Sequence, residues 1–290
     1  MRTVNEHRQF LQALASRAEN PEAGFFGPGS MAWRINRETV LSLVVLRALF
    51  MQIAHPKVAQ GVADHSDFVD KPFQRAYATF KAQQRIVFGS CEESTEALMR
   101  IYARHVGVVG QVEGVALGIR DSSYEANDPS LLFWVFATLF DSMLYAYRTF
   151  MPKLSSSDSA CFYREGKLFA RLIGVSDDKM PATLADFDAW MHNELASNKI
   201  TVTDAGRRIA AALLRMPFGI VRPFNEFLAA VTLPECLREQ FDLRWTVRRA
   251  QLFLLLSRWL RFVLAHTPVV LRSWPVYWIA VQRARSATVS

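Results

Sequence analysis

Apolar residues recur three or four positions apart along almost the whole chain, with polar residues in between, which is the spacing of amphipathic helices. We find no convincing run of alternating apolar and polar residues, and no Asn-Gly or Asp-Gly pair joining two such runs. The pattern therefore predicts an all-α fold. Between Pro and Gly breaks we expect helices near residues 37–54, 71–87, 93–119, 129–150, 156–173, 183–196, 203–213, 218–230, 245–265 and 269–284.

Two of these helix starts carry a capping residue. Asn127 or Asp128 stands before the helix that opens at Pro129, and Ser155 stands before the next one. These side chains would accept hydrogen bonds from the first free backbone N–H groups of each helix. The caps support the boundaries and say nothing about function.

No low-complexity linker and no repeat of fixed period divides the chain. We therefore expect one globular multi-helix domain over residues 1–290, with an N-terminal arm at 1–35 and basic helices at 243–290. The most apolar windows, 41–54, 129–147 and 252–265, are interrupted by Arg47, by Asp141, and by Arg258 with Arg261. A bilayer-spanning helix needs about 18 apolar residues with few or no charges, so none of these windows is expected to span.

The charge is concentrated at the C-terminal end. The 290 residues are 51% hydrophobic with a net charge of +7, which excludes a disordered chain and predicts a large core. Residues 243–290 hold eight arginines and no Lys, Asp or Glu, so this stretch carries +8 and the first 242 residues carry −1. In it, Phe253, Leu256, Leu260 and Val263 alternate with cations. This pattern is typical of a core helix with a solvated face, or of an interfacial helix.

Few sequence features bear on location and partners. The first twenty residues carry charges every few positions, unlike a secretory signal, and Cys91, Cys161 and Cys236 are too far apart for a disulfide framework or a metal-binding pair. We expect a cytoplasmic protein with buried, reduced thiols. The C-terminal arginines would either pair with acids of the body or contact an anionic membrane peripherally. Nucleic acid is not an expected partner, because no recognition motif accompanies the arginines.

Common catalytic motifs are absent. The glycines at 24, 27 and 29 are not followed by the Gly-Lys-Ser/Thr of a phosphate-binding loop, and no dinucleotide-binding glycine pattern follows a strand. There is no Gly-x-Ser-x-Gly and no His-Glu-x-x-His, and the six histidines are too dispersed for an evident zinc signature. These absences disfavour nucleotide-dependent enzymes and the common hydrolases.

The most unusual stretch, residues 52–118, places polar side chains in apolar helices. His55 follows one helix and His65 lies in a loop, and both precede a helix with Arg75 and Thr79 on one face. That pair would line a common cavity. The alternative is a surface arginine and a threonine bonded back to its own helix.

His105 is surrounded by valines and has no polar partner nearby in the sequence. Gly107, Gly110, Gly114 and Gly118 follow it at steps of three and four, which in a helix would leave one face without side chains. Such a face suits either a closely packed second helix or a planar macrocycle ligated by His105. The spacing leaves both open.

Several motifs occur in a characteristic order: GFFGPGS at 24–30 with Trp33-Arg34, QIAHP at 52–56, His65-Ser66, the Pro72/Arg75/Thr79 cluster, Phe88-Gly89, His105 before Val-Gly, YEANDPSLLFWV at 124–135 and LPECLREQFDLRW at 233–245. In this order the sequence resembles the oxygenase superfamily that contains the latex clearing protein, a rubber oxygenase, and the fungal MpaB oxygenase. The motifs cover nearly the whole chain.

The resemblance implies an all-helical protein with an internal pocket for a non-covalent haem b, whose iron uses O₂ to cleave carbon–carbon double bonds of a hydrophobic, isoprenoid-type substrate. Carried over by motif, His105 would be the proximal iron ligand, and Arg75 and Thr79 would line the distal side as catalytic residues. Gly107, Gly110, His55 and His65 would lie around the cofactor. No Cys-x-x-Cys-His occurs, in agreement with non-covalent binding.

Two departures limit what the resemblance implies. Ala78 stands where the latex-clearing branch has a lysine before the threonine, and Phe136 stands where many relatives have a histidine. The substrate and the proton delivery of those relatives are therefore not carried over. The competing function class is a non-catalytic helical protein that binds haem or an apolar ligand. A haem absorption spectrum separates the oxygenase from a carrier of apolar ligands.

Overall fold

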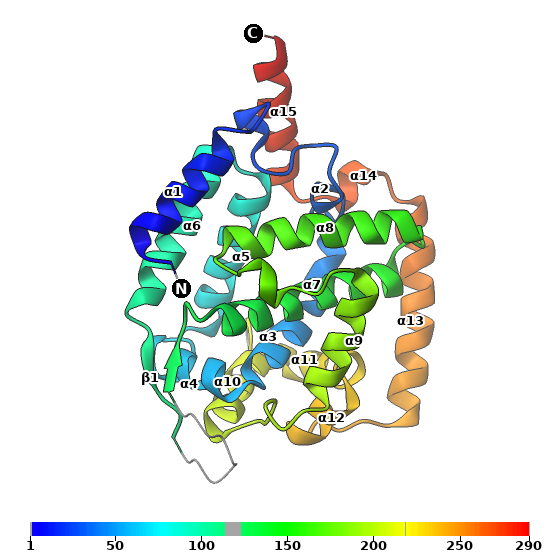
Figure 1. Cartoon of the computed structure of the whole chain (residues 1–290). Helices are drawn as coiled ribbons and strands as arrows, with labels where there is room; N and C mark the ends of the chain where they lie inside the picture. The colour runs from blue at the N-terminus through cyan, green and yellow to red at the C-terminus, as the bar shows by residue number, and fades with distance from the viewer. Residues whose placement is uncertain (1, 114–122, 218, 290) are drawn as a thin grey trace.

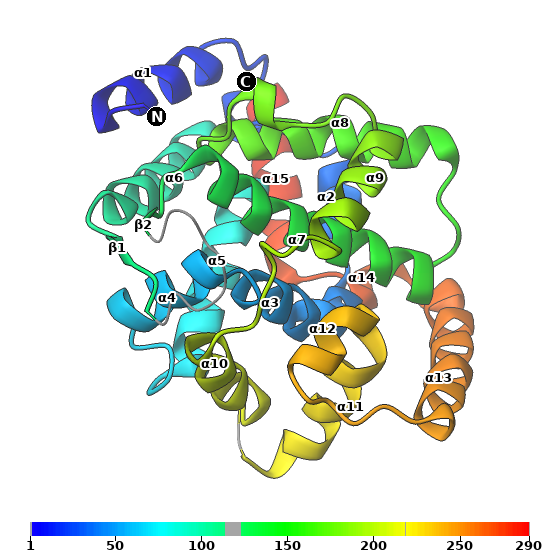
Figure 2. The same ribbon diagram turned by 60° about the horizontal axis from the view of Figure 1, so that its bottom comes forward.

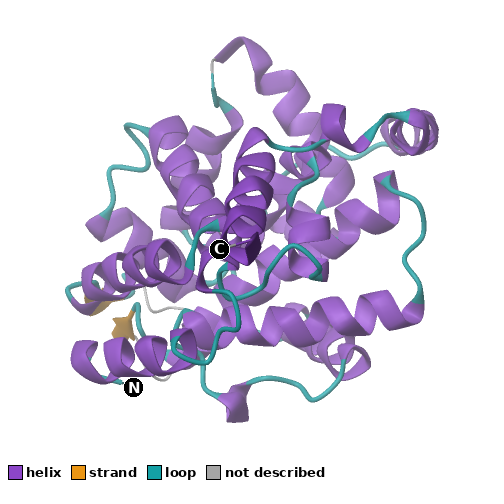
Figure 3. Cartoon of the chain, turned by 90° about the horizontal axis from the view of Figure 1, so that it is seen from above, coloured by secondary structure: helices purple, strands orange, loops and turns teal. Residues whose placement is uncertain are grey.

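The computed structural model describes residues 2–113, 123–217 and 219–289, without the side chains of 288 and 289. These residues are largely helical, with one pair of short strands at the periphery (Figure 3). The first helices are α1 (Val4–Ala15), α2 (Met31–Asn36), α3 (Val45–Ile53), α4 (Pro56–His65), α5 (Pro72–Phe88), α6 (Cys91–Val106) and α7 (Pro129–Phe150) (Figure 1). They are followed by α8 (Ser156–Leu172), α9 (Leu184–Leu195), α10 (Asp204–Leu214), α11 (Arg222–Thr232), α12 (Glu235–Gln240), α13 (Val247–His266), α14 (Val269–Arg272) and α15 (Pro275–Val289). Short 3-10 helices lie at Pro21–Ala23, Thr39–Val44, Asp177–Lys179 and Gly219–Val221.

The mostly helical fold is confirmed, and α5, α7, α8, α9, α10 and α13 lie within two residues of their predicted bounds. The predicted caps are present: Asp128 accepts from the Ser130 and Leu131 N–H groups, and Ser155 accepts from Asp158. α1, α2, α4 and α12 were not predicted. α2 and α12 contain only 6 residues each, which is too short to show a helical period.

The helix predicted over 93–119 is wrong beyond Val106, and the expectation of no strands is wrong at the same place. α6 ends there with Gly107 as its C-cap. The next residues form strand β1 (Val109–Gln111), which pairs antiparallel with β2 (Ser123–Glu125). Glycine is a poor helix former and valine favours strands, so this segment gains more from pairing with β2 than from continuing α6.

Three other boundaries differ from prediction. The segment predicted as a helix over 37–54 begins as the 3-10 helix at Thr39–Val44, and the one predicted over 218–230 becomes α11 only at Arg222. The helix predicted over 269–284 is divided into α14 and α15, because Pro275 has no N–H and starts a new helix. Ser273, between the two, pairs with Glu38 in an isolated β-bridge.

α7 forms the centre of the main hydrophobic core. It crosses the molecule between α3, α8 and α13 (Figure 2) and buries most of its side chains. It is long and apolar enough to span a bilayer, but 67% of its most apolar stretch is buried inside the protein. A second stretch, Thr39–Ile53 together with Pro56–His65, is long and apolar enough to span only if the two helices are taken as one unit, and that unit is bent by 100°. The burial of α7 against its neighbours accounts for its composition.

α5 and α6 form a helical hairpin that positions the candidate site. Only Gly89 and Ser90 connect them, and the two helices lie side by side. The Ser94 hydroxyl of α6 donates to the carbonyls of Arg85 and Ile86 near the end of α5, at 3.1 and 3.2 Å. α1 packs along the other side of α6. The residues at the start of α5 and at the end of α6 therefore lie at the same end of the hairpin.

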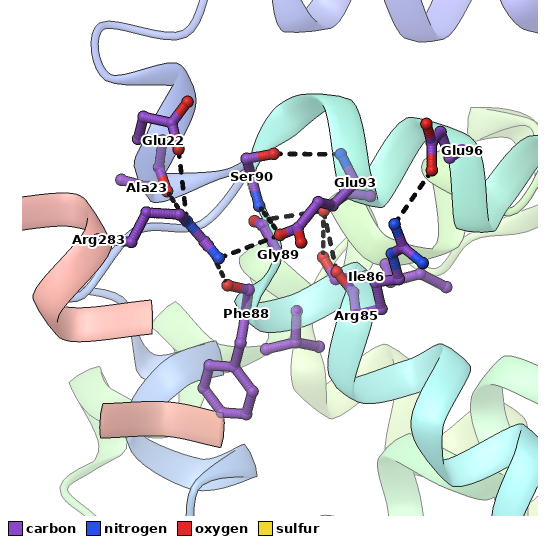
Figure 4. Close-up of polar contacts among 12 residues, drawn as sticks. Glu22, Ala23, Arg85, Ile86, Phe88, Gly89, Ser90, Glu93, Glu96 and Arg283 are labelled. Carbon is purple, nitrogen blue, oxygen red and sulfur yellow. Dashed lines mark hydrogen bonds and ion pairs between the residues drawn. The ribbon is translucent and has the colours of Figure 1, made fainter. Parts of the chain in front are cut away.

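α15 fastens the C-terminal end of the chain to the α5–α6 turn (Figure 4). Arg283 contacts the Glu93 carboxylate at 3.0 Å and donates to the carbonyl of Glu22 at 2.9 Å and to that of Phe88. Gly24, with φ +71°, packs directly against the backbone of Gly89, where a Cβ would clash. The GFFGPGS and Phe88-Gly89 motifs thus meet at this turn.

α13 lies at the outer edge of the molecule (Figures 1 and 2), and it packs inward through the predicted apolar positions except Leu256, which is exposed. Phe253 and Leu264 are buried, and the Phe253 ring contacts Phe150 edge-on with 6.0 Å between centroids. Leu260 is half-buried against the core. The spacing of apolar residues could not show which of them would be exposed, because α13 is apolar on more than one side.

Candidate functional site

The predicted iron ligand and the predicted distal arginine lie at the same end of the α5–α6 hairpin. Arg75 belongs to the first turn of α5 and His105 to the last turn of α6. The segment around His65, at the end of α4, contacts the start of α5 and the strand that follows α6. Arg75 donates to Ser66, and His65 hydrogen-bonds to Val109 in β1. These contacts define one corner of the fold, formed by the ends of α4 and α6, the start of α5, and the two strands.

His105 is half-buried and its Nδ1 is a buried nitrogen without a hydrogen-bond partner among the described residues. Burial lowers the pKa of His105, and the charge of Arg104 lowers it further, while the side chain of Asn127 acts in the opposite direction. Asn127 donates from Nδ2 to the Tyr102 carbonyl at 3.1 Å, and its Oδ1 is also buried without a hydrogen-bond partner. The imidazole is therefore neutral near pH 7, with a lone pair available to a metal.

Arg75 is held by the segment before α5. Its Nε donates to Ser66 Oγ at 3.0 Å and lies 3.5 Å from Asp67 Oδ1. Thr79 is exposed, and its hydroxyl donates to the Arg75 carbonyl at 3.0 Å. In this arrangement Thr79 has the back-bonded geometry that the sequence left open as the alternative, and it stands one turn from the half-buried Arg75.

His65 and Tyr124 form the wall of the corner on the strand side. His65 Nε2 lies 3.1 Å from the Val109 carbonyl oxygen, and this hydrogen bond requires the proton on Nε2. The Tyr124 hydroxyl donates to Asp64 Oδ2 at 2.5 Å, and Asp64 Oδ1 accepts from Gln60 Nε2 at 2.8 Å. Burial, together with the Asp64 carboxylate, raises the pKa of Tyr124, so this hydroxyl stays protonated.

The predicted glycine face is wrong for the part that the structure describes. Gly107 caps α6 and has open space where a Cβ would stand, whereas Gly110 lies in β1. A Cβ on Gly110 would meet the Tyr124 hydroxyl oxygen at 2.5 Å, so this glycine makes room for Tyr124 and not for a second helix. Gly114 and Gly118 lie outside the described residues.

His55 lies at the opposite end of α4 from His65, about 15 Å along the helix axis. It caps the helix by accepting from the Lys57 N–H at 3.2 Å, and its ring lies beside Trp134 at 6.3 Å. Burial, reinforced by Lys57 and Lys199, lowers the pKa of His55 to about 4. The structure thus places His65, Arg75, His105, Gly107 and Gly110 around one corner and His55 apart from it.

A small crevice with a cavity volume of about 30 Å³ lies between α2, α5, α7 and α8, toward the other end of α5. It is lined mainly by apolar residues, among them Phe136, the residue that stands in place of a histidine. Gln83 and Asn36 face it and bond to each other at 3.0 Å. None of the predicted site residues lines this crevice.

Three side chains of the corner were not predicted from the sequence. They are Asp64, Tyr124 and Asn127. Tyr124 donates to Asp64 and lies beside His65 and Gly110, and the Asn127 side chain interacts with His105. Tyr124 and Asn127 belong to the YEANDPSLLFWV motif, so a signal was present in the sequence. Its meaning depends on the pairing of β2 with β1, which spacing alone does not reveal.

Protein side chains do not form a metal site of their own in the part of the chain that is described. No group of three or more His, Cys, Asp or Glu residues there is placed to hold a metal ion. Cys91 is buried as expected, whereas Cys161 and Cys236 are half-buried, and all three are free thiols.

Comparisons with known proteins agree with the motif order. Two uncharacterised mycobacterial proteins, from Mycobacterium tuberculosis and Mycobacterium bovis, are each 26% identical over 229 residues, covering 74% of this chain and 84% of the relative. No solved structure matches the chain. Residues 33–262 match the family described as ER-bound oxygenase mpaB/B'/rubber oxygenase, catalytic domain. Because this match spans most of the chain and contains the whole His65–Arg75–His105 corner, the protein belongs to the family of MpaB and rubber oxygenase catalytic domains.

Proposed function

We propose that the protein is a haem b-dependent oxygenase that uses O₂ to cleave a carbon–carbon double bond in a small hydrophobic, isoprenoid-type substrate. Membership of an oxygenase family supports the reaction class. The observation that carries the proposal is His105, a neutral imidazole in the last turn of α6 whose buried Nδ1 interacts with the Asn127 side chain, which leaves Nε2 as the nitrogen that can ligate a metal. It lies in a corner that also contains Arg75, a cation suited to an oxygen-binding site.

The residues present fit a single-histidine ligation of haem. A neutral imidazole can ligate iron with one nitrogen while the other donates a hydrogen bond that fixes the tautomer. Oδ1 of Asn127 is a buried acceptor with no well-aligned hydrogen bond among the described residues, and the Asn127 side chain interacts with the His105 ring. We assign Asn127 the role of a positioning residue that accepts the Nδ1–H, so that Nε2 of His105 keeps its lone pair for the metal.

When bound, haem b would supply the iron that binds and activates O₂. The residues of the chain supply ligation, charge and exclusion of water. Arg75 would stabilise negative charge that develops on the reacting oxygen, because a guanidinium keeps its charge even when half-buried. Ser66 and Asp67 fix the resting position of Arg75, and Thr79 steadies the same turn of α5 through its bond to the Arg75 carbonyl.

The proposal is tested by the absorption spectrum and iron content of protein expressed with ample haem. The parent protein should show a haem Soret band, and His105→Ala should lose most of it, with recovery on adding imidazole. His192→Ala is the matched control, because His192 is an exposed histidine on α9 and should bind haem as the parent does. Asn127→Ala should bind haem about tenfold more weakly. A haem-free parent would contradict the proposal.

The role of Arg75 is tested separately in the haem-loaded protein. Arg75→Ala should keep the Soret band but change the rate of autoxidation and lower the yield of carbonyl products from an isoprenoid alkene. Autoxidation and turnover at the parental rates would refute this role. The alternative function, an apolar-ligand carrier, predicts ligand binding without haem or O₂ consumption.

A further inference from the structure

α13 has a second apolar side that faces away from the protein. Leu252, Leu255, Trp259 and Phe262 follow at steps of three, four and three, which places them along one face of the helix over about 15 Å. Leu255, Trp259 and Phe262 are 64%, 64% and 65% exposed. We call these four residues the α13 stripe. A surface helix of a globular protein normally presents polar residues on this side.

The orientation of the helix is fixed by contacts on its other side. Phe253 packs on Phe150, and Arg261 donates to the carbonyls of Arg148 and Thr149 at the end of α7, at 2.6 and 2.8 Å. The α13 stripe therefore cannot turn inward without breaking these contacts. The exposed apolar surface continues into the next helix, where Val270 and Leu271 of α14 are 59% and 74% exposed.

Cations lie beside the α13 stripe, and carboxylates are missing from this part of the chain. Arg248 and Arg258 are exposed, and by helical spacing Arg248 lies one turn before Leu252, whereas Arg258 lies one turn from both Leu255 and Phe262. No Asp or Glu occurs after Asp242. A second copy of the chain docked by the same face would bring these arginines toward each other, whereas an anionic lipid surface offers the complementary charge.

We infer that α13, with α14 beside it, is a membrane-surface helix that inserts the α13 stripe among the acyl chains of an anionic bilayer while Arg248 and Arg258 contact the lipid headgroups. Leucine, tryptophan and phenylalanine on the inserted side with arginines at its border are the features of an interfacial helix. The helix lies in the plane of the membrane and does not cross it. This inference goes beyond the proposed oxygenase function and does not depend on haem.

The membrane-surface role of α13 is tested by the binding of the full-length protein to lipid vesicles. Flotation is measured with phosphatidylcholine vesicles, with and without phosphatidylglycerol, for the parent and for Trp259→Gln/Phe262→Gln. The parent should bind the anionic vesicles, and the double variant about tenfold or more weakly. Arg248→Gln/Arg258→Gln should reduce binding to anionic vesicles several-fold for each arginine and leave the weak binding to neutral vesicles unchanged. Arg261 is left in place, because its contacts with α7 support the fold.

Ile279→Gln is the matched control, since Ile279 is 63% exposed on a different helix, α15. It should bind vesicles as the parent does, and circular dichroism should show all variants folded. Parental binding by Trp259→Gln/Phe262→Gln, or no binding of the parent to anionic vesicles, would overturn the inference. Sedimentation that shows a parental dimer and a monomeric double variant, without vesicle binding, would instead assign the α13 stripe to a second copy.

Discussion

Acidification should weaken the packing of α1 against α6 through His7. This residue is 0% exposed, and its ring stacks on Tyr102 with 4.0 Å between centroids. Burial lowers the pKa of His7 to about 4, assisted by Arg2 and opposed only in part by the backbone of Leu172. Neither ring nitrogen forms a well-aligned hydrogen bond in the structure. A protonated His7 would therefore be a poorly solvated charge inside the helix pair.

The magnitude follows from the difference between the two pKa values. In the unfolded chain His7 binds a proton near pH 6.5, whereas in the folded protein it does so near pH 4. The unfolded state thus binds more protons in this range, and the stability contribution is fully present above pH 6.5 and is lost as the pH falls toward 4. At about 1.4 kcal/mol per pKa unit, the complete loss amounts to about 3 kcal/mol.

Urea denaturation followed by circular dichroism at several pH values between 7 and 4 measures this loss. His7→Leu removes the titrating group and keeps an apolar side chain of similar size, so its stability should fall less steeply over the same range. Comparing slopes cancels the contribution of His55, whose pKa is lowered in the same direction, and that of the carboxylates. Parallel pH dependences for parent and variant would refute the reasoning. If His7 titrates as expected, loosening of α1 should also disturb Tyr102, one turn before His105.

Two further substitutions test contacts of the fold. Gly110→Ala would place a methyl group against the Tyr124 hydroxyl, so overpacking should cost about 1 to 3 kcal/mol and lower the melting temperature by several degrees. Arg272→Gln removes a cation 2.8 Å from the carboxylate of Glu38, which is 0% exposed, and should cost about 2 kcal/mol in the free energy of unfolding measured with urea.

Each of these substitutions has a matched control. Gly107→Ala changes a glycine whose added Cβ would have no atom of the described residues within 4 Å, and it should leave the melting temperature near that of the parent. Equal effects at 107 and 110 would show that Tyr124 does not crowd Gly110. Arg258→Gln removes an exposed arginine and should change stability by less than about 0.5 kcal/mol. A loss as large as that of Arg272→Gln would contradict the role given to the Glu38 contact.

Local sequence signals predicted much of the helical framework. The helix at Pro129–Phe150 was predicted at its observed bounds, because Asp128 and Pro129 define its start and a long apolar run follows. Where a boundary depended on distant partners, prediction failed. The end of α6 is decided by the pairing of Gly110 with Tyr124, fourteen residues further along the chain. The same glycine was predicted to open a helical face and instead leaves room for that tyrosine ring.

The candidate site shows the same division between local and distant information. Motif order placed His65, Arg75 and His105 in one site, and the hairpin of α5 and α6 brings the latter two to one end. Asn127 was assigned only a capping role from the sequence, because its effect on His105 depends on how β2 leads into α7. Haem binding and the catalytic roles stay predictions, which the spectra of the His105 and Asn127 variants test.

The arginines of the C-terminal stretch fall into two groups, those that contact the helical body and those that are exposed on α13. Arg272 and Arg283 contact the carboxylates of Glu38 and Glu93, so part of the excess neutralises acids of the helical body. Arg261 binds carbonyls at the end of α7. Arginines used in this way are not free to attract a membrane, and charge alone therefore cannot argue for one. The argument rests on α13, where exposed cations border an apolar face that the fold turns outward.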